Sequence, residues 1–158
     1  MPDPHAPESN QVAALRPLVQ RYLAEAFGAY DTDNEGDYVV PFRSARVYIL
    51  PRDWTAVPDF RTGEERRYTL VLVRAWTNVG MRAGPELAEF ITAENHGLLF
   101  GKLCLDPARP SVYVEHVLLG DYLNFDELAV AVACVAHEAD HYGDTIVARF
   151  GGRRFTDT

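Results

Sequence analysis

The sequence predicts a single α+β domain in which helices pack on an antiparallel sheet. A chain of 158 residues, 47% of them apolar, has the size of one domain and can bury a core. Apolar residues recur with helical spacing near both ends of the chain, and short apolar runs bounded by Pro, Gly and Asp lie between them. The predicted element order is α-β-β-β-α-β-β-α.

The first element is a helix within residues 9–30. Its apolar side chains recur at steps of three and four residues, which places them on one helical face: Val12, Leu15, Val19, Tyr22, Ala26 and Tyr30. Pro17 interrupts this pattern, so the helix either kinks there or begins there. We expect residues 1–11 to form a disordered tail and residues 12–155 to form the domain.

Three strands follow an acidic segment. Residues 38–42 and 46–50 predict two short strands joined by a tight turn, and Pro41 favours an edge position for the first. The polar stretch from Pro51 to Arg66 predicts the longest loop. A third strand is expected over residues 68–76.

The second half of the chain predicts two helices around two strands. Gly84-Pro85-Glu86 is typical of a helix start, and Gly97 of its end. Apolar runs at 98–105 and 112–119 flank a hairpin connection. Asn124 and Glu127 resemble a capping box, and Gly151-Gly152 supplies a stop. The apolar stripe of this last helix contains Phe125, Leu128, Val132, Val135, Ala139, Tyr142 and Ile146.

Two segments of the predicted sheet are apolar at consecutive positions, namely residues 70–73 and 98–100. Side chains alternate between the two faces of a strand, so both faces of the sheet must be covered. Either the helices of the chain cover both faces, or a subunit or bound peptide completes the cover.

Composition limits the classes of partner and the compartment. The formal net charge of −8 and the pI near 5.0 disfavour nucleic acid and anionic membranes, but remain compatible with basic peptides. Cys104 and Cys134 each lie in an apolar run, as expected for buried thiols of a cytoplasmic protein. No signal peptide or membrane span is expected.

His137-Glu138-Ala139-Asp140-His141 matches the H-E-x-x-H pattern of zinc hydrolases. Both histidines, however, are predicted to point away from the buried stripe of the helix, toward solvent. No His or Glu follows His141, and Asp144 lies ~10 Å along the helix axis from His137. A metal-dependent hydrolase is therefore an alternative interpretation, and a ligand such as His116 would have to complete the site.

Other catalytic and metal motifs are incomplete. Residues 31–37 resemble the start of an EF-hand loop, but Phe42 stands where calcium requires a bidentate glutamate, which favours a solvated acidic turn. No serine lies in a nucleophile elbow and no glycine-rich phosphate loop occurs. We expect neither a cofactor nor catalytic residues.

The C-terminal half resembles the bacterial YbjN family, which is related in fold to type III secretion chaperones. The resemblance rests on residues 95–105 (NHGLLFGKLCL), 106–107, 116–121, 127–128 and 149–152. The segment Glu35-Gly36-Asp37-Tyr38 and the element order also fit. The resemblance implies a compact chaperone-like fold, a peptide-binding role and a homodimer, and it implies no catalysis.

We therefore predict a domain that binds a protein or peptide through an apolar surface of its sheet. Tyr48, Leu72 and Trp76 are the predicted contacts. The alternatives are the zinc hydrolase using His137, Glu138 and His141, and a module that only associates with itself.

Overall fold

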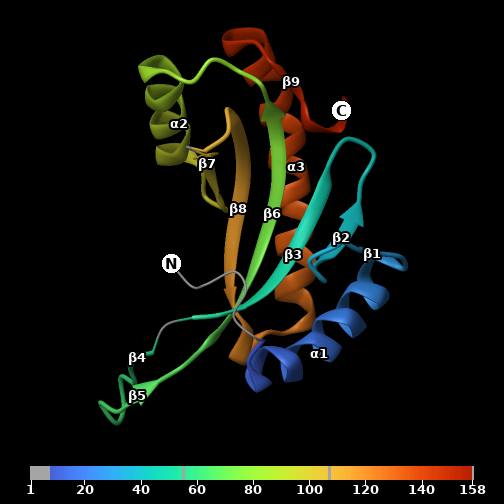
Figure 1. Cartoon of the computed structure of the whole chain (residues 1–158), viewed down its shortest axis with the longest axis vertical. Helices are drawn as coiled ribbons and strands as arrows, with labels where there is room; N and C mark the ends of the chain where they lie inside the picture. The colour runs from blue at the N-terminus through green and yellow to red at the C-terminus, as the bar shows by residue number, and fades with distance from the viewer. Residues whose placement is uncertain (1–7, 55, 107, 158) are drawn as a thin grey trace.

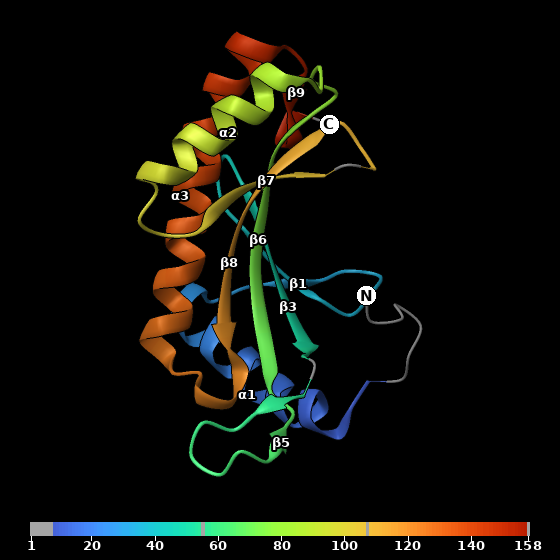
Figure 2. The ribbon, with the colours of Figure 1, turned by 90° about the vertical axis from the view of Figure 1, so that its left-hand side faces the viewer.

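The structure is a computed structural model that describes residues 8–54, 56–106 and 108–157. Helices α2 (Pro85–Gly97) and α3 (Phe125–Phe150) lie on one side of a twisted antiparallel sheet in Figure 2, and α1 (Asn10–Phe27) packs against α3 and β3 (Arg46–Asp53) near its lower end. Figure 1 looks onto the opposite side of that sheet. The predicted α+β class, with helices packed on an antiparallel sheet, is confirmed.

The main sheet has the strand order β1-β2-β3-β6-β8-β7, and every neighbouring pair is antiparallel. Its strands are β1 (Asp31–Thr32), β2 (Tyr38–Pro41), β3 (Arg46–Asp53), β6 (Thr69–Val79), β7 (Lys102–Asp106) and β8 (Ser111–Leu119). The long strands β3, β6 and β8 lie side by side in its interior. Consequently, residues far apart in the sequence share one continuous face.

A short segment after the last helix adds a final strand. Strand β9 (Arg153–Arg154) pairs with Asn78 and Val79 of β6. These residues lie beyond Ala75, where the pairing of β6 with β3 stops at Val47. The 3-10 turn η2 (Phe155–Asp157) follows directly. We call residues 153–157 the strap.

The predicted loop from Pro51 to Arg66 contains more structure than expected. Residues 51–53 continue β3, and β4 (Val57–Pro58) pairs with β5 (Glu65–Arg66). Figure 1 shows this hairpin projecting from the lower end of the sheet. The side chain of Asp59 accepts hydrogen bonds from the N–H groups of Arg61 and Thr62, which stabilises the turn between the two strands.

Helix α1 (Asn10–Phe27) does not begin at Pro17, which was one of the two alternatives that the sequence left open. The hydroxyl of Ser9 accepts a hydrogen bond from the N–H of Val12, so Ser9 is the N-cap and Pro17 lies inside the helix. Of the expected tail, residues 1–7 lie outside the described part of the chain, and Asn10 and Gln11 are helical.

Helix α3 (Phe125–Phe150) agrees with the sequence prediction at both ends. Asn124 accepts a hydrogen bond from the N–H of Glu127, and Gly151 ends the helix with a positive φ of 76°. Its predicted stripe is buried except for Phe125, which is half-buried. The helix packs lengthwise along the sheet and contributes the largest helical share of the core.

Helix α2 (Pro85–Gly97) covers the end of the sheet at β7. The predicted strand over residues 98–105 is wrong in its first part, because Leu98 to Gly101 form a connection and β7 begins at Lys102. Leu99 is fully exposed in this connection. The side chain of Asn95 both accepts a hydrogen bond from the N–H of Leu103 and donates one to its carbonyl, so α2 occupies the outer edge of β7.

The core lies between the helices and the adjacent face of the sheet. Val47, Ile49, Val71, Val73 and Val114 have 0% of their surface exposed on this face. No helix in the described residues combines the length and the apolar character that crossing a membrane requires. Among the described residues, no helix lies over the opposite face of the sheet.

Candidate functional site

The face of the sheet that carries no helix, the open face, is apolar along most of its length. Alternation along β3, β6 and β8 sends one set of side chains to the helices and the other set to this face. Antiparallel sheets with one solvated face usually carry polar side chains there. Here the face instead holds two groups of apolar side chains.

The aliphatic patch lies on the open face at the end of the sheet where β6 begins, which is the lower end in Figure 1. Register places its members side by side, since Leu72 is opposite both Leu50 and Val117, and Leu70 is opposite Leu119. Its members are half-buried or exposed: Leu50, Leu70, Leu72, Val117 and Leu119. Val117 and Leu119 are 39% and 42% exposed, so this surface remains open to a partner.

An aromatic cluster occupies the upper half of the same face. The ring centroids of Trp76 and Tyr113 are 4.8 Å apart in an edge contact. Phe155, from the strap, lies 6.4 Å from Trp76 and 6.5 Å from Tyr48. These four rings are half-buried and form one cluster of large side chains. The two tyrosines each carry a hydroxyl group, and the tryptophan carries a ring N–H.

Charged side chains between the two groups are paired with one another. Glu115 is 6% exposed and accepts hydrogen bonds from Arg74 at 2.9 and 2.5 Å. Lys102 lies 3.4 Å from the same carboxylate. The guanidinium of Arg74 also sits 4.6 Å from the ring centre of Tyr113. The network therefore pairs the buried carboxylate of Glu115 with cationic side chains of the same face.

The acidic segment before β2 forms the margin of the open face. Asp37 is 1% exposed and forms a two-pronged ion pair with Arg52. Burial and pairing of Asp37 differ from the solvated turn that the sequence predicted. Asp33 accepts hydrogen bonds from the N–H groups of Glu35 and Asp37, so its carboxylate stabilises the turn.

The three predicted contact residues all lie on the open face. Tyr48 is opposite Arg74 in the ladder, Leu72 belongs to the aliphatic patch, and Trp76 belongs to the aromatic cluster. The sequence prediction did not include Tyr113, Val117, Leu119 or Phe155. Period-two alternation along the run 112–119 indicates Tyr113, Val117 and Leu119 as one set, whereas only the fold brings Phe155 to them.

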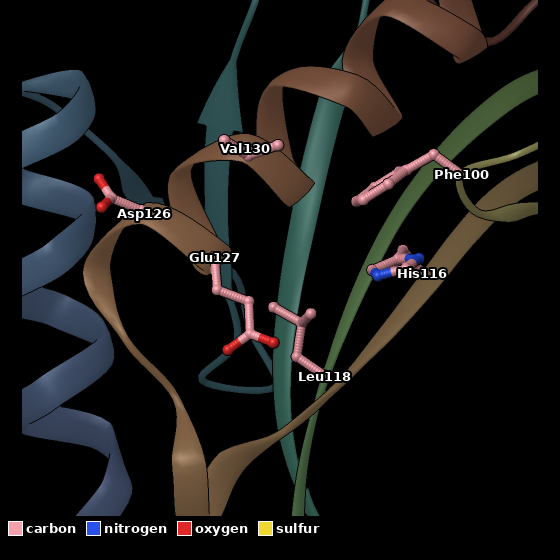
Figure 3. A pocket seen from close by; sticks show the side chains of 6 residues that line it. All are labelled: Phe100, His116, Leu118, Asp126, Glu127 and Val130. Carbon is pink, nitrogen blue, oxygen red and sulfur yellow. The ribbon is translucent and has the colours of Figure 1, made fainter.

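A separate pocket lies on the helix-bearing side of the sheet. It has a volume of about 360 Å³, and Figure 3 shows the side chains that line it: Phe100, His116, Leu118, Asp126, Glu127 and Val130. The ring of His116 stacks on Phe100 with centroids 3.9 Å apart. Burial lowers the pKa of His116, and the charge of Glu127 partly opposes this shift. The pocket is suited to an apolar side chain.

The zinc-like motif does not assemble a metal site in the described part of the chain. His137 and His141 are exposed on α3, as the stripe predicted. No three His, Cys, Asp or Glu side chains among the described residues cluster in a way that would hold a metal ion. Asp140, inside the motif, instead accepts a hydrogen bond from Arg154.

The two cysteines are half-buried rather than fully buried as predicted. Burial raises the pKa of the Cys104 thiol, and the nearby Glu115 carboxylate adds to the effect. A thiol with a raised pKa is a poor nucleophile at neutral pH. Cys104 is therefore a packing residue of the open face.

The arrangement defines a class of protein: an α+β domain whose sheet is packed by helices on one face and exposes an apolar surface on the other. A family model described as "T3SS (YopN, CesT) and YbjN peptide-binding chaperone 1" matches residues 13–158. The chain belongs to this family of peptide-binding chaperones. The predicted resemblance and the predicted peptide-binding, chaperone-like role are thereby confirmed at the level of the family.

A solved structure described as the crystal structure of the ExsC-ExsE complex has the same fold. The TM-score is 0.54 at 16% sequence identity, and the match covers 81% of this chain and 92% of that chain. No curated protein matches the chain by sequence.

Proposed function

We propose that the open face of the sheet is the surface on which this chaperone-family domain binds an extended segment of a partner protein. The observation that carries the proposal is the aliphatic patch, in which five apolar side chains lie on a sheet face without a helix. A partner segment with alternating apolar side chains would remove this surface from water. The proposed role is binding without catalysis.

The charge of the whole chain favours apolar segments with basic flanks. The chain has a formal net charge of −8, which accelerates encounter with basic segments. Beside the aliphatic patch, the Arg52–Asp37 pair is neutral, and the Lys102–Glu115–Arg74 network places two cations on one carboxylate, so these groups do not themselves attract a basic flank. Affinity would therefore come from the burial of apolar surface, and the association rate would be raised by the electrostatic field of the whole chain.

Peptide selection with a matched pair of variants tests the site. Binders would be selected from a displayed library of random peptides against the wild-type chain, and their affinities measured by calorimetry. Leu72→Asp places a charge in the aliphatic patch, while the control Val130→Asp places the same charge at the pocket, where Val130 is 53% exposed. We expect Leu72→Asp to abolish binding and Val130→Asp to preserve it.

Trp76→Ala measures the contribution of the aromatic cluster. Loss of one buried aromatic contact costs about 2 kcal/mol, or about thirtyfold in Kd. Circular dichroism of each variant would establish that it is folded. Binding that tolerates Leu72→Asp but fails in Val130→Asp would move the site to the pocket and refute the proposal.

We also propose that the domain acts in the cytoplasm and forms a homodimer. Cys104 and Cys134 are free thiols, as is usual for proteins of a reducing compartment. Val130, which lines the pocket, and Leu99, which adjoins the lining residue Phe100, are both exposed, and association of two copies there would cover them. Light scattering at two concentrations tests the dimer, and Leu99→Asp should shift the mass to that of a monomer.

A further inference from the structure

The strap is seated on the molecule in the manner of a bound peptide. Figure 1 shows it beside the upper end of β6, next to the turn that joins β2 and β3. It pairs with β6 through Arg154 opposite Asn78 and Arg153 opposite Val79. In this position it pairs with the part of β6 that lies beyond the last residue paired with β3, which is Ala75 opposite Val47. Successive strap residues therefore point to opposite faces of the sheet.

Arg154 points to the helix-bearing side, into a seat on α3. It donates hydrogen bonds to Asp140 at 2.5 Å, to Asp144 at 3.0 Å and to the carbonyl of Ser44 at 3.3 Å. A Cβ at Gly143 would lie 3.1 Å from Nε of Arg154, so the guanidinium packs closely against the backbone of α3 where Gly143 has no side chain. The seat is thus shaped for a guanidinium and carries two carboxylates for it.

The same pairing lowers the pKa of Asp140, chiefly through the hydrogen bond from Arg154. Asn78, opposite Arg154 in the ladder, donates a hydrogen bond to the carbonyl of Gly143 and so holds β6 against the seat. The seat is therefore built from α3, β6 and the turn before β3. These elements belong to the fold whether or not the strap is present.

Phe155 points to the open face, where it completes the aromatic cluster between Tyr48 and Trp76. The strap therefore occupies part of the surface that we propose for partner binding. Its ladder contact with β6 is two pairs long, and its ion pairs involve the side chains of Asp140 and Asp144, which are 49% and 81% exposed. Exposed ion pairs contribute little, so a competing segment can displace the strap.

We propose that this seat recognises an extended partner segment in which an arginine is followed directly by an aromatic residue, and that the strap occupies the seat until such a segment displaces it. The inference rests on the proposed function and specifies one class of its partners. The arginine of the partner takes the place of Arg154 on α3, and its aromatic residue takes the place of Phe155 beside Trp76. Both carboxylates and the net negative charge of the chain favour a cationic segment.

The test uses the full chain with its own strap side chains removed. In the variant Arg154→Ala/Phe155→Ala the seat is empty, and a fluorescent peptide with the sequence of residues 151–158 serves as the probe. Fluorescence anisotropy should show at least about tenfold tighter binding to this variant than to the wild type, in which the strap competes. A peptide with alanine at both probe positions is the control and should not bind.

Two further variants in the same background locate the peptide. Asp140→Asn combined with Asp144→Asn removes the charges of the seat and should weaken binding about fivefold, with the greater loss at low salt. If the double strap variant does not fold, Arg154→Ala alone empties the position of the guanidinium on α3, while Phe155 keeps its ring contacts. Absence of binding to every emptied variant, or binding that the two Asn substitutions leave unchanged, overturns the inference.

Failure of this inference is separable from failure of the proposed function. Leu72 lies in the aliphatic patch, away from the ladder of the strap. If the strap peptide does not bind but Leu72→Asp abolishes binding of selected peptides, the seat is refuted and the open-face site stands. If the strap peptide binds but Leu72→Asp has no effect on selected peptides, the aliphatic patch is refuted and the seat stands.

Discussion

The two faces of the sheet are built from the same strands and from similar side chains, yet they differ in what covers them. On β3, Ile49 is 0% exposed beneath the helices, and its neighbour Leu50 is half-buried on the open face. On β6, Val71 and Val73 are fully buried, while Leu70 and Leu72 between and beside them are not. The comparison teaches that apolar character alone does not distinguish core residues from surface residues of a sheet. The position of the helices decides which apolar side chains become core.

The largest expected effect comes from truncating adjacent residues on the two faces. Ile49→Ala should lower the free energy of unfolding by about 3 kcal/mol, because a cavity forms in a packed core. Leu50→Ala should cost less than about 1 kcal/mol, because its side chain already meets water. Urea unfolding with unchanged slopes measures both values. Equal losses would show that the open face is packed as tightly as the covered one.

Alkaline titration probes the covered side. Burial, followed by the hydrogen bond that Tyr142 donates to Glu94, raises the pKa of Tyr142 to about 12 from 10.0. Between these pH values the unfolded chain has released a proton that the folded chain retains, so stability falls as pH rises from 10 to 12. Tyr142→Phe should flatten this fall. An unchanged slope in the variant would assign the loss to other groups.

Acid titration of His116 should give a smaller loss of stability, and this loss should occur as pH falls rather than as it rises. Burial against Phe100 lowers the pKa of His116 below 6.5. The unfolded chain therefore binds a proton first, and the stability present above pH 6.5 is lost as pH falls through the folded pKa. Subtracting the profile of His116→Gln from that of the wild type isolates this contribution. A flat difference would contradict the stacked, buried ring.

The smallest effect is expected on the open face. Val117→Thr changes one methyl group to a hydroxyl at a position that is 39% exposed, and should shift the free energy of unfolding by no more than about 0.5 kcal/mol. Val114→Thr makes the same change on the same strand at a 0% exposed position, where burying a hydroxyl costs about 1–3 kcal/mol. Equal values would remove the distinction between the faces.

Local signals in the sequence predicted most of the fold. The apolar stripe and the caps of α3 are properties of neighbouring residues, and they placed Asn124 and Gly151 correctly. Leu98 to Phe100 were predicted as strand because they are apolar, but the connection after α2 turns there, and Phe100 packs on His116. A run of three apolar residues does not distinguish these outcomes.

The candidate site was predictable only in part. Alternation places Leu72 and Trp76 on one face, since they are four positions apart on a strand and an even spacing returns a side chain to the same face. Sequence does not reveal that this is the open face, because the choice depends on which side the helices pack. Phe155 lay outside any prediction, since the strap has two ladder residues and its partners are some 75 positions earlier, at Asn78 and Val79.

The amide of Asn95 has a consequence for how the protein meets other chains. It satisfies the outward N–H and C=O of Leu103, two of the groups through which a foreign strand would attach to β7. An uncovered edge strand is a template for pairing with further chains, which leads to aggregation. By occupying part of this edge, Asn95 disfavours the addition of a foreign strand at β7, although the chain exposes apolar side chains on the open face.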